Sequence, residues 1–484
     1  MTCVAPRRTS RMFLRQIYDD ALAQAAYLIG CQQTGEALVI DPERDIDRYY
    51  RLAADNGLTI TAVAETHIHA DFVSGAQEFA ADPAVTLYLS SLGGDDWSYT
   101  WPGPDTRVHY LKDKESFFIG KIEIQAIHSP GHTPEHLSYA IIDHGGGADE
   151  PVAVVTGDFV FVGDVGRPDL LESAAGVAGA MEPSARTLRA SLAQRLVPLP
   201  DFVQVLPGHG AGSACGKALG AIPSSTIGYE RRFNGVLKLA ETDAEGFVRE
   251  ILSGQPEPPL YFKRMKHVNR DGIRVTGGVP SCSHLSPRQF ADLAGHAGVQ
   301  VVDTRADRSA FETAHVSGSL CAPLSGSSLV NSAGSFLTEN DSLLLVVDDQ
   351  SVLDQVTRQL YRIGFDDFAG WATFSELEQA GLAISQLQST DFDRFSPAEH
   401  SAGARLLDVR NRSEYDEGHI TGAVNVSYTR LRERIDELPS DARYYVYCAS
   451  GRRAALASSF LRARGYDVVL VNGSAEAYFQ TDVA

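Results

Sequence analysis

The sequence predicts an α/β protein with three domains, at residues 1–260, 284–380 and 395–484. Its 484 residues exceed what one hydrophobic core usually supports. The N-terminal part alternates short β-rich runs with loops, and the C-terminal part contains an internal repeat. The first boundary is placed at the proline-rich segment 255–259, which follows a polar helical stretch near residues 229–252 and cannot continue it.

Composition excludes several functional classes. The net charge is −20, and binding to nucleic acid requires clustered Lys and Arg. No apolar run reaches the length of about 18 residues that a membrane span needs. The six cysteines form no CxxC pair, which argues against a disulfide framework. We therefore expect a cytoplasmic protein that binds neither nucleic acid nor a membrane.

Apolar runs in the first domain end directly in loops that carry His or Asp. Residues 60–64 precede His67, His69 and Asp71, and residues 152–155 precede Asp158. His132 and His209 lie in glycine-flanked loops of the same kind. One loop histidine is usually structural, but four such sites in one domain predict a metal centre. Imidazole together with carboxylate suits a divalent transition metal better than calcium or magnesium.

The C-terminal part consists of two related copies. Residues 301–305, 315–318 and 360–365 correspond in order to residues 406–410, 419–422 and 461–466. Each copy alternates strands and helices, as expected of a small doubly wound α/β domain. The sequence therefore predicts a domain duplication rather than a short solenoid repeat.

The second copy carries a reactive cysteine. Cys448 ends an apolar strand at 443–447 and precedes a helical run, an arrangement in which backbone N–H groups form an anion cradle. Arginines beside the sulfur favour the nucleophilic thiolate. The rest of the predicted loop consists of Ala449, Ser450, Gly451, Arg452 and Arg453.

The first copy lacks this chemistry. Its equivalent strand at 343–347 runs into Asp348 and Asp349, with no thiol. We predict no transferase activity there, but a structural role in docking the outer domains or holding a homo-oligomer. Cys321, elsewhere in this copy, is expected to be inert.

These motifs resemble known families over essentially the whole chain. The HxHxD, GHT, GD and GH motifs resemble the metallo-β-lactamase superfamily, and residues 65–75, 129–136 and 156–170 resemble its persulfide dioxygenase branch, which includes fusions to rhodanese domains. The Cys448 loop and residues 408–410 and 418–422 resemble rhodaneses. A tyrosine phosphatase loop would need arginine where Ala454 stands. The resemblance implies an αββα sandwich followed by two small α/β rhodanese domains, the first without its catalytic cysteine.

The resemblance also implies a cofactor. One non-haem Fe(II) per chain would be held by His67, His132 and Asp158, with O₂ as co-substrate. His69, Asp71 and His209 would lie nearby, outside the ligand set. Binuclear hydrolases of the superfamily have a further histidine ligand where this chain has Phe72, so we do not expect two metals. Asp164 and Asp169 either orient ligands or are ordinary loop residues.

The implied reactions are oxidation of a thiol persulfide to sulfite, and sulfur transfer by Cys448 that interconverts sulfite and persulfide with thiosulfate in a direction the sequence leaves open. The carrier would be glutathione, coenzyme A or a similar thiol. Basic residues at 229–232 and 263–266 could contact it or simply face solvent. Cys215, six residues after His209, is either a sulfur relay or a small side chain in a tight loop.

Two other functions stay open. One is thioester hydrolysis of the glyoxalase II kind, with zinc-bound hydroxide as nucleophile. The other is a sulfide or persulfide sensor with a structural metal, in which Cys448 acts as a redox switch.

Overall fold

The chain forms two compact units in the computed structural model, which describes residues 12–173, 179–217, 219–395 and 404–475. The first unit comprises residues 1–255 and 262–278, and the second comprises 256–261 and 279–484. Segment 262–278 thus folds with the first unit, although the sequence-based boundary lies at residue 260. The expected third domain also includes 396–403 and 476–484, which lie outside the described residues. Within the described part of the chain, no helix is both long and apolar enough to cross a membrane.

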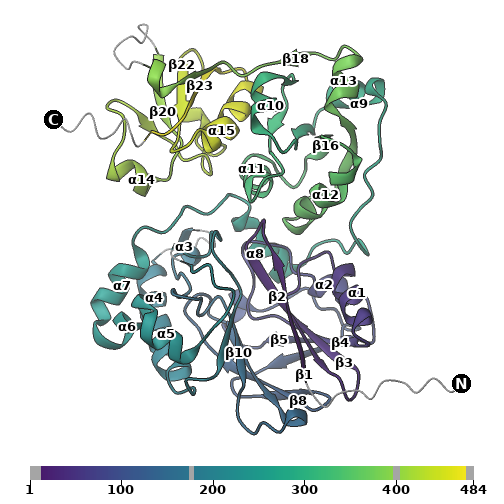
Figure 1. The fold of residues 1–484 in the computed structure, drawn as a ribbon, viewed down its shortest axis with the longest axis vertical. Helices are drawn as coiled ribbons and strands as arrows, with labels where there is room; N and C mark the ends of the chain where they lie inside the picture. Colours follow the sequence, from purple (N-terminus) through teal and green to yellow (C-terminus); the bar gives the residue numbers. More distant parts are fainter. Residues whose placement is uncertain (1–11, 174–178, 218, 396–403, 476–484) are drawn as a thin grey trace, which may run out of the picture. The chain divides into compact units, whose positions relative to one another are not determined.

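The first unit contains two six-stranded sheets (Figure 1). The first sheet consists, in spatial order, of β1 (Met12–Asp19), β2 (Gln24–Cys31), β3 (Glu36–Ile40), β4 (Thr59–Ala64), β5 (Thr86–Ser90) and β6 (Val108–Leu111). The second consists of β12 (Ser225–Thr226), β11 (Gln204–Pro207), β10 (Ala153–Gly157), β9 (Leu137–Asp143), β8 (Ile122–His128) and β7 (Ser116–Ile119).

The two sheets pack face to face, and successive side chains of each strand point alternately to the two faces of its sheet. In β2, Tyr27 and Ile29 point into the core between the sheets, where they meet Ile124 and Tyr139 of the second sheet. The intervening Leu28 belongs to a separate core on the outer face of the first sheet. Strands buried on both faces read as continuous apolar runs, which explains the runs that the sequence shows.

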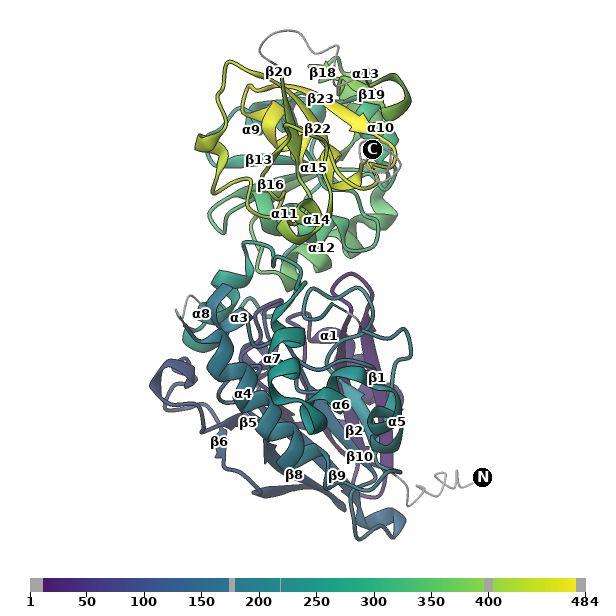
Figure 2. The same cartoon turned by 90° about the vertical axis from the view of Figure 1, so that its left-hand side faces the viewer.

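Helices cover both outer faces of the sandwich. On the first sheet lie α1 (Asp47–Asp55) and α2 (Ala76–Phe79). On the second sheet lie α4 (Met181–Ser191), α5 (Ile227–Phe233), α6 (Gly235–Thr242) and α7 (Ala244–Leu252), and α4, α6 and α7 run side by side in Figure 2. The unit also contains α3 (Leu170–Ser173) and α8 (Phe262–Asp271). The result is an αββα sandwich.

The polar helical stretch near 229–252 is three helices rather than one. Asn234 accepts a hydrogen bond from the backbone N–H of Leu237 and caps α6, and Asp243 caps α7 through Gly246. A short side chain that satisfies the free N–H groups at a helix start favours an interruption at that position. The breaks let successive helices turn along the second sheet.

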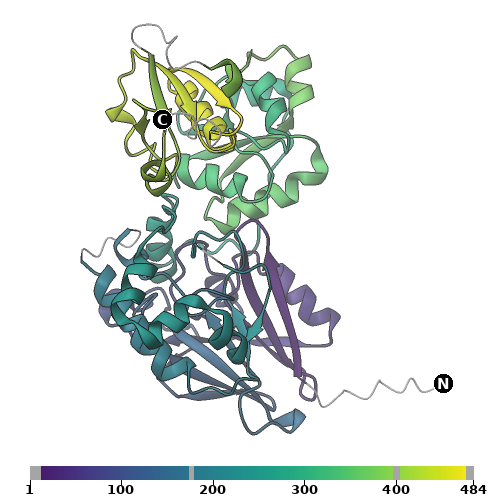
Figure 3. The ribbon, with the colours of Figure 1, turned by 60° about the vertical axis from the view of Figure 1, so that its left-hand side comes forward.

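The second unit contains two parallel sheets of matching order. In the first, β13 (Val299–Asp303) lies between β15 and β16, and in the second, β20 (Ala404–Asp408) lies between β21 and β22. The other elements of the first sheet region are α9 (Pro287–Ala294), α10 (Arg308–Thr313), β14 (His315–Val316), β15 (Leu320–Cys321), α11 (Ser328–Phe336), β16 (Ser342–Val347), α12 (Leu353–Arg362), β17 (Phe368–Thr373), α13 (Phe374–Gln379) and β18 (Ile384–Ser385). Those of the second are β19 (Ser389–Asp391), α14 (Arg412–Glu417), β21 (Val424–Asn425), β22 (Arg443–Tyr447), α15 (Arg452–Ala463) and β23 (Asp467–Asn472). Figure 3 shows the two copies in green and yellow.

The two copies agree in detail. The orders β15-β13-β16-β17 and β21-β20-β22-β23 are equivalent, with β19 added beside β23. The Asp303–Arg305 ion pair, at 2.8 Å, has its counterpart in Asp408–Arg410 at 2.6 Å. The repeat in the sequence is therefore a repeat in the structure.

Candidate metal centre and cysteine loop

Three side chains predicted as metal ligands lie together at the ends of different strands. His67 follows β4, His132 lies in the loop between β8 and β9, and Asp158 follows β10. One nitrogen or oxygen of each lies within 4.8 Å of the others, and all three side chains are buried. Asp158 Oδ2 is 3.5 Å from Nε2 of His132 and 4.0 Å from Nε2 of His67.

Neighbouring polar groups leave the Nε2 atoms of both histidines free. The Thr66 hydroxyl donates to Asp41 at 2.8 Å, so it can only accept from Nδ1–H of His67, 2.9 Å away. His132 donates from Nδ1 to the carbonyl oxygen of Arg167 at 3.0 Å. The lone pairs of both Nε2 atoms therefore face Asp158, as metal ligation requires.

The cluster has the electrostatics of a cation site. Both carboxylate oxygens of Asp158 are buried without a hydrogen-bond partner in the described protein. Burial raises the pKa of Asp158 to about 6 and lowers the pKa of His132 to about 4. A cation would supply the missing partner for the carboxylate, and the neutral imidazoles are in the form that binds metals. Two imidazoles and one carboxylate thus fit a divalent transition metal.

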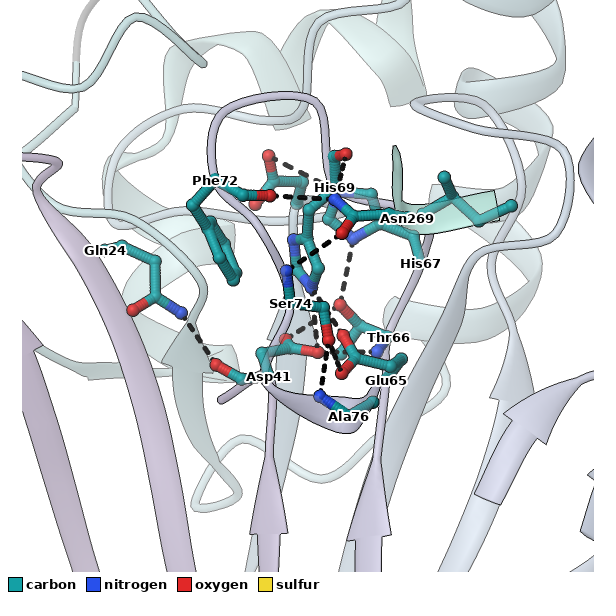
Figure 4. A network of polar contacts seen from close by, with 12 residues as sticks. Gln24, Asp41, Glu65, Thr66, His67, His69, Phe72, Ser74, Ala76 and Asn269 are labelled. Atoms are coloured by element: carbon teal, nitrogen blue, oxygen red, sulfur yellow. Dashed lines mark hydrogen bonds and ion pairs between the residues drawn. The ribbon is translucent and has the colours of Figure 1, made fainter. Parts of the chain in front are cut away.

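The His69 side chain points toward Asp41 and Glu65 (Figure 4). Its Nε2 lies 3.2 Å from Asp41 Oδ1 and 3.0 Å from Glu65 Oε2, and these three residues form a separate buried group. Burial opposes a charge on His69, but the two carboxylates raise its pKa well above the ordinary value. His69 thus groups with Asp41 and Glu65, two residues that the sequence-based interpretation did not identify.

Asn269 on α8 holds the loop that carries His67 and His69. Its Nδ2 donates to the carbonyl oxygens of His69 and Phe72, each at 2.8 Å, and its Oδ1 accepts from Ser74 N–H at 2.9 Å (Figure 4). A single buried side chain thus satisfies three backbone groups of this loop.

A second donor group adjoins the first. His209, after β11, has its Nε2 3.3 Å from Asp71 and 3.4 Å from Asp158, and Asp71, His209 and Cys215 each offer a ligand atom within 4.8 Å of the other two. Phe72 is fully buried with its ring 4.3 Å from that of His69. The sequence-based argument counted only Asp71 and His209 beside Asp158, so the structure adds the Cys215 sulfur as a third donor.

The remaining acidic residues of the site have other partners. Asp169 pairs with Arg167 at 2.5 Å, and the carbonyl of Arg167 in turn orients His132. Asp164 accepts from the backbone N–H of Val165. Gly208 gives the site room, because a Cβ at that position would lie 2.7 Å from Asp158 Oδ1.

In the second unit, Cys448 lies where the sequence predicts, between β22 and α15. The side chain is fully buried, and Gly451 has a φ of +80°, which favours glycine at this turn into the helix. Arg453 forms a two-fold ion pair with Glu414, at 2.6 and 2.7 Å. Its charge is therefore shared with a carboxylate that the sequence did not indicate.

The copy without a cysteine contributes to the surroundings of this loop. A Cβ on Gly451 would lie 3.0 Å from Nη1 of Arg308, at the start of α10, and 2.5 Å from Oδ1 of Asn472. Glu312 connects them, since it pairs with Arg308 Nε at 3.0 Å and accepts from Asn472 Nδ2 at 2.9 Å. Nη1 of Arg308 is buried without a hydrogen-bond partner in the described residues.

At the equivalent place in that copy, β16 ends at Val347. The two aspartates that follow, Asp348 and Asp349, accept hydrogen bonds from backbone N–H groups. Asp348 accepts from Ala306 N–H at 2.9 Å, and Asp349 caps the following turn through Ser351 N–H at 2.7 Å. Cys321 is buried, and its backbone N–H donates to the Ser459 hydroxyl of α15 at 3.0 Å.

Sequence reasoning missed several of these residues. Asp41 directly follows the apolar run of β3, so the rule that identified Asp158 could have found it. Asn269, Arg308 and Asn472 carry no local signal, because each acts on a segment far away in the chain.

Two family models match separate parts of the chain. Residues 19–209 match the metallo-beta-lactamase superfamily, and residues 395–481 match the rhodanese-like domain. The solved structure of a metallo-beta-lactamase from Staphylococcus aureus subsp. aureus COL is 39% identical, with a TM-score of 0.68, over 75% of this chain and 99% of that one. The mitochondrial persulfide dioxygenase ETHE1 of Bos taurus is 26% identical over 51% of this chain and 85% of its own length. A hydroxyacylglutathione hydrolase of Rhodospirillum rubrum is 35% identical over 35% of this chain and 59% of its own.

Proposed function

Since this chain belongs to the metallo-β-lactamase superfamily and ends in a rhodanese domain, we propose that it is a persulfide dioxygenase coupled to a sulfurtransferase. The observation that carries the proposal is the placement of His69. With His69 paired to Asp41 and Glu65, the donor set is His67, His132 and Asp158 rather than three histidines. Two histidines and one carboxylate form the facial set typical of non-haem Fe(II) oxygenases.

In the first unit, one set of residues would hold the iron and another set orients the ligands. His67, His132 and Asp158 would hold one iron(II), which when bound supplies the redox chemistry for oxidation of a persulfide by O₂. Thr66 and the Arg167 carbonyl fix the tautomers of the two histidines, and Asn269 fixes the loop. Overall, thiol persulfide, O₂ and water become thiol, sulfite and two protons.

In the second unit, Cys448 would carry a sulfane sulfur on its own sulfur. Transfer to sulfite breaks the cysteine S–S bond and forms the new S–S bond of thiosulfate, which leaves the Cys448 thiol free. The reverse direction would draw sulfur from thiosulfate and supply persulfide to the first unit. We assign the copy at 284–380 as rhodanese-like on its matching strand order, with no transfer of its own. Fusion in one chain keeps reactive sulfur species near both centres.

The test uses full-length protein loaded anaerobically with Fe(II) and given glutathione persulfide in an oxygen electrode. We expect oxygen uptake with sulfite and thiosulfate as products. Cys448→Ser should take up oxygen normally but accumulate sulfite in place of thiosulfate, whereas Cys321→Ser serves as the matched control. Absence of oxygen uptake by iron-loaded protein would reject the oxygenase, and unchanged thiosulfate output from Cys448→Ser would reject the coupled scheme.

One observation favours a second candidate. Asp71, His209 and Cys215 could hold a second cation next to Asp158, which is the arrangement that a binuclear hydrolase needs. The similarity to a hydroxyacylglutathione hydrolase points the same way. Zinc-loaded protein with two metals per chain that hydrolyses a glutathione thioester, without oxygen uptake by the iron form, would establish this alternative.

The role of Cys215 follows from the same geometry. We propose that Cys215 accepts a sulfane sulfur near the centre, because its sulfur lies in one buried group with Asp71 and His209. If Cys215→Ser consumes oxygen normally with every persulfide donor, Cys215 is only a small side chain that fills its loop.

A further inference from the structure

His136 is a buried histidine beside the candidate metal centre that supplies no atom to the donor set. It ends the loop that carries His132 and stands directly before β9. Its side chain has no contact with solvent. Buried polar groups persist in a protein core where they find hydrogen-bond partners, and the partners of His136 lie around the centre.

The ring of His136 contacts two of the three candidate ligands. Its Nε2 accepts a hydrogen bond from the backbone N–H of Asp158 at 3.2 Å. The ring also stacks on that of His67, with the centroids 5.1 Å apart and the planes inclined by 24°. A single imidazole therefore holds the backbone from which the Asp158 carboxylate projects and limits the rotation of the His67 ring.

The hydrogen bonds of His136 fix its tautomer. Because Nε2 accepts from a backbone N–H, the ring proton lies on Nδ1, which donates to Oγ of Ser129 at 2.9 Å. The Ser129 hydroxyl can in turn donate to Oγ of Ser138, also at 2.9 Å. Burial lowers the pKa of His136 well below its ordinary value, so the ring is neutral. A neutral ring offers Asp158 an acceptor without adding a charge next to a cation site.

The backbone before Asp158 fits closely against this ring. Gly157 has a φ of +50°, in the region that favours glycine. A Cβ at Gly157 would lie 2.8 Å from Nε2 of His136 and 2.6 Å from Oγ1 of Thr66. The same glycine is the point at which the pairing of β10 with β11 shifts its register. The turn that carries Asp158 is therefore shaped around the imidazole.

We propose that His136 is a positioning residue, which holds Asp158 and His67 in the orientation that the cation requires. The inference rests on the donor set of the proposed function, and it applies to an oxygenase and to a hydrolase alike. Without the Nε2 acceptor, the N–H group of Asp158 would be buried without a partner and the carboxylate would lose its fixed direction. Groups that orient metal ligands are worth about 10- to 100-fold in metal affinity.

Two substitutions separate the hydrogen bond to Asp158 from the rest of the side chain. In His136→Gln, the amide oxygen replaces Nε2 as an acceptor, whereas the shorter side chain of His136→Asn can donate only to Ser129. Full-length, metal-free protein is titrated with Co(II) against a chelator, and visible absorption and EPR report the geometry of the bound ion. We expect His136→Asn to lower the Co(II) affinity by about 10- to 100-fold and to change both spectra. His136→Gln should recover most of the affinity and the wild-type spectra.

Controls distinguish positioning from folding. His144→Asn makes the same substitution at an exposed position and should bind Co(II) as wild type does. Ser129→Ala keeps the imidazole but removes the partner of its Nδ1, and should lower the Co(II) affinity by a smaller factor than His136→Asn. Circular dichroism of the metal-free proteins shows whether His136→Asn folds. If it does not fold, the comparison of Ser129→Ala with wild type decides, and equal Co(II) affinity of these two proteins would overturn the proposal.

Asp158→Asn reports on the donor set itself. If Asp158→Asn loses Co(II) affinity while a folded His136→Asn binds as wild type with unchanged spectra, the role of His136 is overturned and the donor set stands. If Asp158→Asn binds Co(II) as wild type does, the donor set fails, and the oxygenase and the role of His136 fail with it. Iron-loaded wild type that takes up no oxygen would reject the oxygenase alone, because Co(II) binding does not depend on the reaction.

Discussion

Nδ2 of Asn269 donates a 2.8 Å hydrogen bond to the carbonyl oxygen of His69, a residue 200 positions earlier in the chain. The same amide group also binds Phe72 and Ser74. The loop that carries His67 and His69 is therefore held by a helix beyond the proline-rich segment.

Asn269→Ala should destabilise the first unit. The change leaves two carbonyl oxygens and one N–H group buried without partners, at about 1–3 kcal/mol for each group. We expect the free energy of unfolding to fall by about 3 kcal/mol or more. Urea unfolding followed by Trp97 and Trp101 in a Trp371→Phe background measures it.

The control for that experiment is Asn56→Ala, which removes one exposed hydrogen bond to the Leu52 carbonyl. Its unfolding midpoint should stay near that of the parent. Equal midpoints for Asn269→Ala and the parent would show that the Asn269 hydrogen bonds do not stabilise this loop.

The three-residue donor set predicts which variants lose metal. His67→Ala, His132→Ala and Asp158→Asn should each lower the affinity for iron(II) by more than about tenfold. Replacement of a residue that only orients a ligand already lowers metal affinity by about 10- to 100-fold. His69→Gln should retain more iron than any of these three variants, because His69 faces Asp41 and Glu65 and supplies no ligand atom to the donor set. Elemental analysis after anaerobic loading and desalting gives the iron content of each variant.

Exposed His109 provides the control, as His109→Gln should bind iron as wild type does. A folded His69→Gln protein that loses iron as completely as His67→Ala would show that the donor set includes three histidines.

Acid should weaken the second unit in a defined pH range. Glu376 accepts hydrogen bonds from Thr373 N–H and Oγ1, at 2.9 and 2.7 Å, and meets His284 at 3.1 Å. The backbone hydrogen bond from Thr373 is the largest of the causes that lower the pKa of Glu376 from 4.5 to about 2. A carboxyl whose pKa is lower in the folded state stabilises the protein above its unfolded pKa, and this stabilisation is lost as the pH falls.

The stability of wild type should therefore fall more steeply than that of Glu376→Gln between about pH 4.5 and about pH 2. Urea unfolding at several pH values, followed by Trp371 with Trp97 and Trp101 replaced by Phe, measures both proteins. Parallel curves would show that Glu376 does not contribute.

Arg308 should assist sulfur transfer by Cys448, although it belongs to the copy without a cysteine. Its guanidinium lies against Gly451 and so adds positive charge beside the loop that we propose binds anionic sulfur donors. We expect Arg308→Met to slow transfer from thiosulfate to cyanide by about three- to tenfold, with oxygen uptake unchanged. Arg308→Lys should recover part of the loss.

Arg288→Met, an exposed change on α9, removes the same charge from the same copy and should leave transfer unchanged. An equal loss in Arg288→Met and Arg308→Met would assign the effect to net charge alone.

The sequence predicted the parts of this molecule that are local. The candidate metal donors each follow a buried strand, so a motif of a few residues indicates His67 or Asp158 without knowledge of the fold. The internal repeat predicted two equivalent copies, and their strand orders agree. Lys266 shows the limit: it stands in a basic segment that equally suggests a solvent-facing helix, and only tertiary packing buries it. The pairing of Arg453 with Glu414 was hidden for the same reason, because the two side chains come from different helices.

The chain passes from the first unit to the second at Pro256, returns at Phe262, and leaves again at Val279. During synthesis, the strands of the β-sandwich therefore emerge from the ribosome before α8, whose Asn269 holds the loop of His67 and His69. A truncated protein that stops at residue 260 would contain every candidate ligand and lack both Asn269 and Lys266. The first unit is complete only when residue 278 has been translated, and a single cut after that residue would leave segment 256–261 of the second unit on the first fragment.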